Sequence, residues 1–247
     1  EIHTYVLLRD ILKDAPESLK WVFIEISLDK GYEPISNART GRSVYWHNFK
    51  NTRIAIDYIF NSEEQLLSKA ALASSHILPL IYQKFNLGAF FKKLFPIDFS
   101  SVEAKEDKRL YEANDGFLGI ANNEYNRTRK SFLASPSDYQ QEVKGLIEYH
   151  EKDSKANEPL PNNKQVLIEK ILEEVNSAGA APIFIVPPTL HTADDLHQAY
   201  KDNTIPTLLA YNNPSKYPQF YGIENRHDPE HLNIKTADAF SREVARD

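Results

Sequence analysis

Two segments of this chain share one order of features: a helical pattern of apolar residues, a short connection, and an apolar run of strand length. Residues 2–13 carry the first helical pattern, and the run Trp-Val-Phe-Ile-Glu-Ile-Ser follows at 21–27. Residues 166–175 carry the second, followed by Gly179 and the run Pro-Ile-Phe-Ile-Val-Pro-Pro at 182–188. Apolar runs of this length are typical of parallel strands buried on both faces. Helices that alternate with such strands predict an α/β fold.

The remaining segments fit one large domain. A chain of 247 residues is long enough for a single α/β domain with a substantial core, and we interpret 1–247 in this way. Residues 51–95 are predicted to form a helical insertion or lid, in which Pro79 should break or kink the helix. The Ser-Asp-Tyr-Gln sequence at 137–140 predicts a helix that begins with a capping box. Residues 204–211 predict a short last strand.

The segment His227–Asn233 places an Asp three residues before a His. Pro229 disfavours helical geometry at Asp228, so we expect this carboxylate in an extended or turn segment. Asn233 is a suitable cap for the apolar-periodic helix predicted after it. Asp228 can accept a hydrogen bond from one ring nitrogen of His231, which fixes the tautomer and leaves the other nitrogen available as a base. The segment therefore predicts two members of a Ser-His-Asp triad.

Two other interpretations of this segment remain open. In a chain with eight His residues, an Asp-x-x-His sequence can arise by chance in a surface loop. His227, Asp228, Glu230 and His231 are also potential metal ligands. Pro229 weakens this interpretation, because it keeps the two His residues from sharing a helical face as they do in His-Glu-x-x-His sites. We rank the triad first, the surface loop second and a metal site third.

The Asp-x-x-His-Leu-Asn motif at 228–233, with a predicted helix after it, resembles the last block of the SGNH (GDSL-like) hydrolases. The resemblance is nearest to the branch that includes bacterial polysaccharide O-acetylation proteins. It implies a flavodoxin-like three-layer α/β/α sandwich with a parallel central sheet. It also implies a triad in which Asp228 orients His231 and His231 activates a Ser nucleophile. That chemistry requires no metal and no organic cofactor.

The chain departs from the family pattern in two places. The resemblance makes the run 21–27 the third strand of the sheet, after which the family usually has an oxyanion-hole Asn; this sequence continues with Ser-Leu-Asp instead. The family's nucleophile block precedes the first helix seen here, so the first strand and the nucleophile Ser are expected outside the printed chain. The sequence also contains no Met. We therefore hypothesise that residues are missing from the printed sequence, including its N-terminus.

Two further residues are weak candidates for substrate binding. Ser27 ends the first apolar run, at the edge where open α/β sheets build their sites, but it lacks the flanking glycines of a nucleophile elbow. His47 belongs to the cluster Trp46-His47-Asn48. Such a polar-aromatic trio either lines a carbohydrate site or packs within a loop.

Composition excludes several classes of partner and chemistry. The net charge of −6 and a pI of about 5.8 argue against non-specific nucleic-acid binding. No apolar run approaches a transmembrane span, no signal peptide is visible, and the absence of Cys excludes disulfides and thiol chemistry. The family resemblance favours a periplasmic or cell-envelope location, with membrane association through an N-terminal anchor outside the printed sequence.

The expected function is that of a serine esterase or O-acyltransferase. Its substrate would be a small acyl ester or the acyl groups, such as acetyl, of a polysaccharide. The alternative is a catalytically silent SGNH-like domain that binds glycan or a protein partner. The sequence does not distinguish hydrolysis from transfer, and it does not define the oligomeric state.

Overall fold

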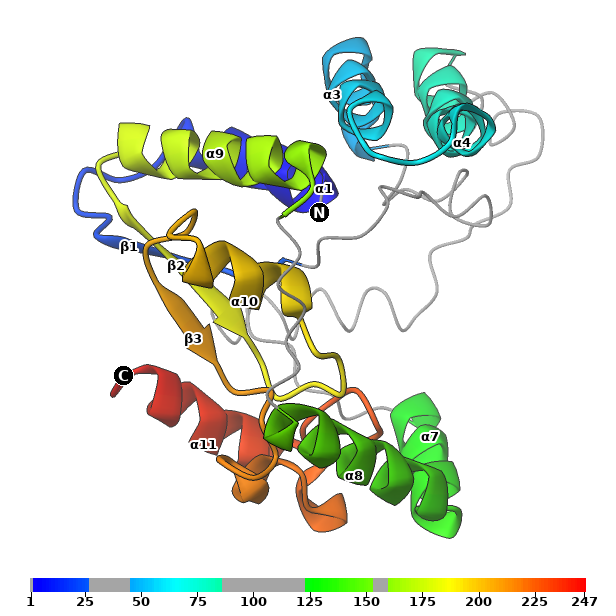
Figure 1. Ribbon diagram of the computed structural model, residues 1–247, viewed down its shortest axis with the longest axis vertical. Helices are drawn as coiled ribbons and strands as arrows, with labels where there is room; N and C mark the ends of the chain where they lie inside the picture. The colour runs from blue at the N-terminus through cyan, green and yellow to red at the C-terminus, as the bar shows by residue number, and fades with distance from the viewer. Residues whose placement is uncertain (1, 27–44, 86–122, 153–159) are drawn as a thin grey trace. The chain divides into compact units, whose positions relative to one another are not determined.

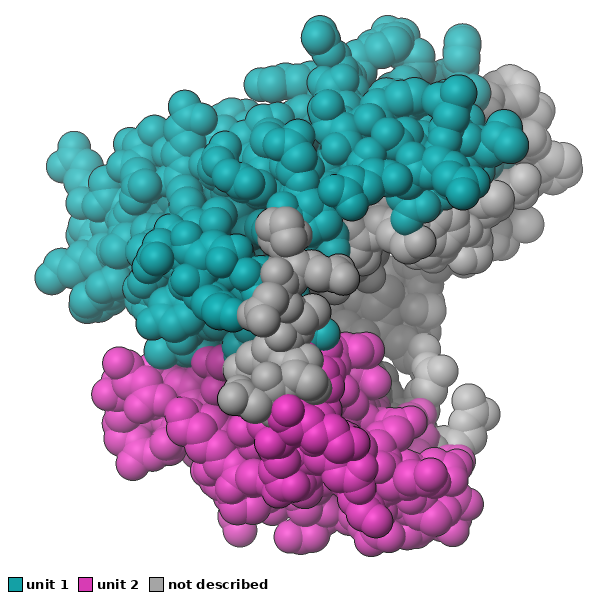
Figure 2. Space-filling view, in the orientation of Figure 1, with its two compact units in different colours: residues 1–94, 155–186, 193–209 teal, residues 95–154, 187–192, 210–247 magenta. Residues whose placement is uncertain are grey.

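The computed structural model describes residues 2–26, 45–85, 123–152 and 160–247 (Figure 1). The chain forms two compact units, shown in different colours in Figure 2. Unit 1 comprises Glu1–Leu94, Lys155–Val186 and Ala193–Leu209, and unit 2 comprises Phe95–Ser154, Pro187–Thr192 and Ala210–Asp247.

Unit 1 combines helices with a parallel sheet of three strands in the order β1-β2-β3. Its described elements are α1 (Ile2–Leu12), β1 (Trp21–Ile24), α3 (Phe49–Phe60), α4 (Leu66–Phe85), α9 (Asn162–Ser177), β2 (Ala181–Val186), α10 (Asp194–Lys201) and β3 (Leu208–Ala210), whose last residue belongs to unit 2. In the β1–β2 pair, Trp21 lies opposite Ala181 and Ile24 lies opposite Phe184. The predicted α/β class is confirmed, and so are both predicted helix–strand pairs.

The second of these pairs is formed by α9, Gly179 and β2. The buried face of α9 carries Leu167, Ile168, Ile171 and Val175. Their three- and four-residue spacing places them on one side of the helix, which packs against both β2 and α1 (Figure 1). Gly179 has a φ of 76°. This left-handed conformation carries no Cβ penalty for glycine, so the chain can end the helix there and enter β2.

The prediction that both runs are buried on both faces is wrong for the described residues. Along β1, Trp21 is 59% exposed and Phe23 is 50% exposed, whereas Ile24 is buried. Along β2, Pro182, Phe184 and Val186 are buried, and the residues between them are more exposed. Successive strand side chains point to opposite faces, so this alternation means that one face of the sheet is covered more fully than the other. β1 is also an edge strand in the described sheet.

Residues 49–85 are mainly helical, as predicted for the first part of the insertion, and α3 packs against α4. Asn48 caps α3, because its side chain accepts a hydrogen bond of 2.9 Å from the backbone N–H of Asn51. Pro79 lies inside α4, which continues to Phe85, so the proline does not end this helix. The rest of the predicted insertion, 86–95, lies outside the described residues.

Unit 2 contains the helices α7 (Asn123–Ala134), α8 (Ser137–Glu151) and α11 (Ile234–Val244), and two short 3-10 turns, η2 (Pro218–Phe220) and η3 (Ile223–Asn225). α11 packs through Phe240, whose ring meets those of Tyr211 and Phe220 edge-on at centroid distances of 5.0 and 5.4 Å. Edge-to-face packing is the geometry that aromatic rings prefer. The C-terminal helix is therefore anchored in an aromatic cluster.

The start of α8 corrects a detail of the sequence analysis. A helix is present as predicted, but its first residue is Ser137, which the prediction placed at the N-cap, and the capping box is not formed. Pro136 occupies the N-cap position without a side-chain cap, and its carbonyl accepts the backbone N–H of Gln140 at 3.0 Å. Because the helix starts one residue earlier than the box requires, Ser137 stands at its first helical position.

No helix in the described part of the chain is long and apolar enough to span a bilayer.

Candidate active site

The segment 226–232 in unit 2 forms a tight turn closed by its own backbone. Arg226 and Leu232 form an antiparallel bridge, and the carbonyl of His231 accepts the backbone N–H of His227 at 2.8 Å. Just after the turn, the side chain of Asn233 accepts the backbone N–H of Thr236 at 2.9 Å and α11 begins at Ile234. Both local predictions are confirmed: a non-helical Asp228 before the proline, and a helix capped by Asn233.

The carboxylate of Asp228 collects three donors from within this turn. Its Oδ1 accepts the backbone N–H groups of Glu230 at 2.9 Å and His231 at 2.8 Å. Nδ1 of His231 lies 2.9 Å from Oδ1 and 3.0 Å from Oδ2. Burial raises the pKa of Asp228, but the hydrogen bond from His231 and the two backbone N–H groups outweigh it, so the net pKa is lowered. Asp228 is therefore an ionised carboxylate held inside the turn.

The imidazole of His231 is oriented on one side and open on the other. An ionised carboxylate can only accept, so Nδ1 must carry the proton and donate it to Asp228. Among the described residues Nε2 has no hydrogen-bond partner, and the side chain is 59% exposed. A neutral imidazole in this tautomer presents a free lone pair to solvent or to a substrate. This arrangement can take a proton from a hydroxyl and later return it.

A buried arginine, which the sequence analysis did not single out, supports the turn from inside. Arg226 is fully buried. Its Nη1 donates to the carbonyl of Pro188 at 2.8 Å, and its Nη2 donates to the carbonyl of Pro229, between the Asp and the His. The guanidinium carbon lies 5.9 Å from the ring centres of both Tyr139 and Tyr221. Arg226 thus connects the turn to the segment that follows β2 within unit 2.

The two tyrosines around Arg226 are themselves fixed by hydrogen bonds. The hydroxyl of Tyr139 donates to the carbonyl of Tyr221 at 2.9 Å. The hydroxyl of Tyr221 lies 3.0 Å from the carbonyl of Thr189 and 3.2 Å from that of Tyr211. Burial raises the pKa of both phenols, and the charge of Arg226 acts in the opposite direction. Both tyrosines are therefore neutral donors near pH 7.

A surface depression of about 440 Å³ lies next to the turn. It is lined by Glu142, Gly145, Leu146 and Tyr149 of α8, by Leu190, His191 and Thr192, and by Glu230. Buried Asn212 supports the 191–192 segment, since its amide donates to the carbonyls of His191 at 3.1 Å and Thr192 at 2.8 Å. Glu230 precedes His231 directly, so this depression offers space for a ligand beside the turn.

The other two predicted site residues do not add to this turn. Ser27 lies outside the described residues. His47 belongs to unit 1 and is fully buried. Its Nε2 lies 2.9 Å from Nδ1 of His76, and the centre of its ring lies 3.7 Å from the centre of the Trp46 ring. The Trp46-His47-Asn48 cluster is therefore packed at His47, the second of its two interpretations, and this imidazole does not face an open site.

Metal ligation has no support in the described part of the chain, which holds no group of three or more His, Cys, Asp or Glu arranged around a common point. His227, a ligand in the metal interpretation, is buried.

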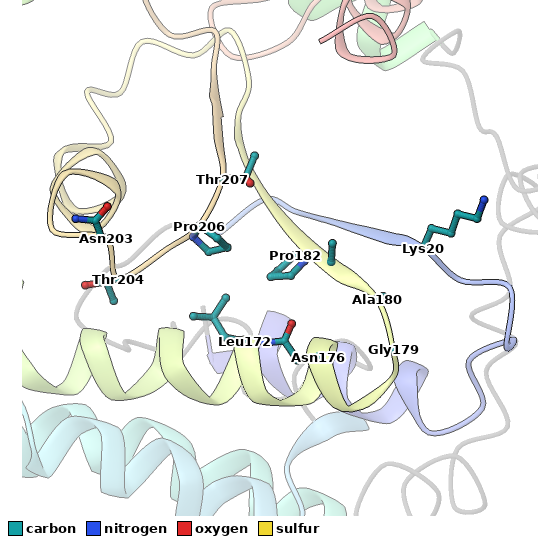
Figure 3. A pocket seen from close by; sticks show the side chains of 11 residues that line it. Lys20, Leu172, Asn176, Gly179, Ala180, Pro182, Asn203, Thr204, Pro206 and Thr207 are labelled. Atoms are coloured by element: carbon teal, nitrogen blue, oxygen red, sulfur yellow. The ribbon is translucent and has the colours of Figure 1, made fainter.

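A second depression, of about 750 Å³, lies in unit 1 at the amino-terminal ends of the strands (Figure 3). Lys20 precedes β1, Pro182 lies near the start of β2 and Thr207 precedes β3; all three line it. Open α/β sheets build their sites at the carboxyl ends of the strands. This depression lies at the opposite edge, so we do not assign the active site to it.

In comparisons with known proteins, no family model, no curated protein and no solved structure matches this chain.

Proposed function

We propose that this protein is a serine esterase or O-acyltransferase of SGNH type that acts on ester-linked acyl groups. The observation that carries the proposal is the Asp228–His231 pair: a buried, ionised carboxylate holds Nδ1 of an exposed imidazole and leaves Nε2 open. This is the arrangement that two members of a Ser-His-Asp triad require. A histidine on a surface loop by chance would not need a buried carboxylate at its Nδ1.

In this proposal each residue has one role. His231 takes the proton from a Ser hydroxyl as the oxygen attacks the ester carbonyl, and it returns that proton to the leaving alkoxide. Asp228 keeps the imidazole in its Nδ1–H tautomer and stabilises the imidazolium that forms. Water, or the hydroxyl of a second sugar, then attacks the acyl-Ser and releases the acyl group.

For the fold, we propose the flavodoxin-like three-layer sandwich that the resemblance implies. It is supported by the parallel β1-β2-β3 order, by α9, which directly precedes β2, and by α10, which connects β2 to β3. For the substrate, we propose a small acyl ester or an acylated polysaccharide. The depression beside Glu230 supports a ligand of this kind, because its lining combines apolar and aromatic side chains with carboxylates.

Fluorophosphonate labelling tests the proposal. The probe forms a covalent bond with an activated Ser, and digestion with mass spectrometry locates the labelled peptide. We expect labelling of one Ser in the wild-type protein, and loss of labelling in His231→Ala. Arg242→Ala is the matched control: it changes an exposed side chain on α11 that forms an ion pair with Asp238. Failure of a folded wild-type protein to react would overturn the proposal.

The second candidate is a catalytically silent domain that binds glycan or a protein partner. It is favoured by the surroundings of His231: in the described residues no hydroxyl lies within hydrogen-bonding distance of its Nε2. The absence of an Asn after the strand that includes Ile24 points the same way. Under this candidate the protein shows no fluorophosphonate labelling and no hydrolysis of p-nitrophenyl acetate, and His231→Ala leaves glycan binding unchanged.

A further inference from the structure

We propose that Arg226 is the positioning residue of the Asp228–His231 pair: its guanidinium fixes the carbonyl of Pro229 and thereby holds the turn in the one conformation that keeps Nδ1 of His231 on the carboxylate. The assignment rests on the proposed function for its catalytic meaning. The positioning itself is a property of the folded protein that can be measured without any activity.

The charged guanidinium of Arg226 lies in an unusual environment. In the described part of the chain Arg226 forms no ion pair within 4.0 Å. The guanidinium is instead surrounded by two carbonyl oxygens and by the faces of two tyrosine rings. Its Nε is buried and has no hydrogen-bond partner among the described residues. Burying a charge without a counter-ion is costly, so this residue needs a reason beyond filling space.

The two carbonyls that accept hydrogen bonds from Arg226 lie in different segments of the chain. Pro188 follows β2, and Pro229 lies between Asp228 and His231. Both prolines lack a backbone N–H. A planar guanidinium can donate to two acceptors in different directions at once, which an ammonium group on a flexible stem does less well. Arg226 therefore ties the middle of the turn to a segment distant in sequence.

Arg226 is also held in place through its own backbone. Its residue bridges Leu232 at the far end of the turn, and its carbonyl accepts a hydrogen bond from Nη1 of Arg129 on α7. The turn is thus fixed at its ends by the backbone and in its middle by the guanidinium. Loss of the middle contact frees the peptide unit between Pro229 and Glu230 to rotate, because the proline ring fixes only φ of Pro229. Such a rotation moves the Asp228 carboxylate away from the N–H groups of Glu230 and His231.

The test measures the tautomer of His231 in the full-length protein. Long-range ¹H–¹⁵N correlation spectra at pH 8 distinguish imidazoles protonated at Nδ1 from those protonated at Nε2. We expect the Nδ1–H tautomer in the wild type. In Arg226→Met and Arg226→Lys we expect conversion to the Nε2–H tautomer in most molecules, because His231 no longer faces Asp228.

Tyr139→Phe is the matched control for damage to packing. It keeps the ring beside the guanidinium but removes the hydrogen bond to the carbonyl of Tyr221. We expect a lower melting temperature in this variant with the Nδ1–H tautomer retained. If Arg226→Met does not fold, Arg226→Lys decides the test, since it keeps the charge and most of the volume. A folded Arg226 variant that retains the Nδ1–H tautomer would overturn the assignment.

Kinetics with p-nitrophenyl acetate separate this inference from the proposed function. If the protein is an esterase, Arg226→Lys should lower kcat about tenfold or more and change KM less than about twofold, because it alters the catalytic pair and leaves the depression lined by α8 intact. If the wild type is inactive but the tautomer changes as expected, the positioning role stands and the proposed function fails.

Discussion

Two side-chain pairs that contain histidine, His47–His76 and Asp228–His231, have similar hydrogen-bond distances but differ in whether the imidazole can act as a base. In unit 1, Nε2 of His47 lies 2.9 Å from Nδ1 of His76, and both rings are buried beside Trp46. In unit 2, Nδ1 of His231 lies 2.9 Å from a buried carboxylate while the rest of the ring is exposed. A histidine becomes a usable base when its partner is an anion and its second nitrogen meets solvent. Distance alone does not distinguish the two pairs.

The largest expected effect is the loss of activity when His231 of unit 2 is replaced. Under the proposed function, His231→Ala should reduce hydrolysis of p-nitrophenyl acetate by about 10⁴–10⁶-fold, because removal of the base would disable the proposed triad as a unit. The melting temperature should change by no more than about 2 °C, because the side chain is largely exposed. Steady-state kinetics and circular dichroism on the same samples check both. Activity within tenfold of wild type would refute the triad.

The matched substitution in unit 1 should affect stability. His76→Ala removes a buried ring and leaves the buried His47 without this hydrogen-bond partner. We expect the free energy of unfolding to fall by about 2–4 kcal/mol, from the cavity and the lost hydrogen bond together. Urea denaturation measures this loss. Fluorophosphonate labelling of the folded fraction should be unchanged, and a selective loss of labelling would show that the two pairs do not divide chemistry and packing as we infer.

The ionised carboxylate of Asp228 should make the stability of the protein depend on pH. Asp228 has a pKa below its ordinary value of 3.8. The unfolded chain therefore takes up the proton first as pH falls, so the stabilisation by Asp228 is present above about pH 4 and is lost as pH drops through the lower folded pKa. Urea midpoints at pH 3–7 should fall less steeply on acidification in Asp228→Asn than in wild type. Parallel curves would mean that the carboxylate is not held as an anion.

The smallest effect concerns the helix that follows the turn. Asn233→Ala removes the cap of α11, in which the side chain accepts the backbone N–H of Thr236. A lost N-cap of this type costs about 1 kcal/mol. The urea midpoint measures it. Asn233→Asp should restore the cap, because a carboxylate also accepts the N–H of Thr236, but it cannot restore the hydrogen bond of 2.6 Å that Nδ2 of Asn233 donates to the carbonyl of Glu224. If Asn233→Ala is neutral, the start of α11 is fixed by its other contacts, such as the packing of Phe240 and the hydrogen bond of 3.0 Å from the backbone N–H of Asn233 to the carbonyl of Asn225.

What the sequence predicted correctly is mostly local. The turn at Asp228, the cap at Asn233 and the helix–Gly179–strand unit depend on residues within a few positions of one another, where backbone sterics and spacing decide the conformation. The double burial predicted for β1 failed because an apolar run does not say what covers each face of a strand. The predicted capping box at Ser137 failed because a single-residue shift in the helix start removes its geometry.

The candidate site was predictable only as far as its local part. Asp228 and His231 are three residues apart, so the motif contains their pairing. Arg226 acts on the same turn, but its partners Pro188 and Tyr139 lie far away in sequence, and no pattern connects them before the chain folds. The packing of His47 against His76 is likewise a long-range contact. An isolated polar-aromatic trio could not reveal that it faces inward.

The contrast between the faces of unit 1 also gives the molecule an optical property. The sequence contains two tryptophans. Trp46 is packed against the His47–His76 pair, and Trp21 stands on the exposed face of the sheet. Their emission should separate into a component shielded from acrylamide and a component that is readily quenched. The shielded component therefore comes from the indole packed beside the buried His47–His76 pair, so it reports on that packing without any added label.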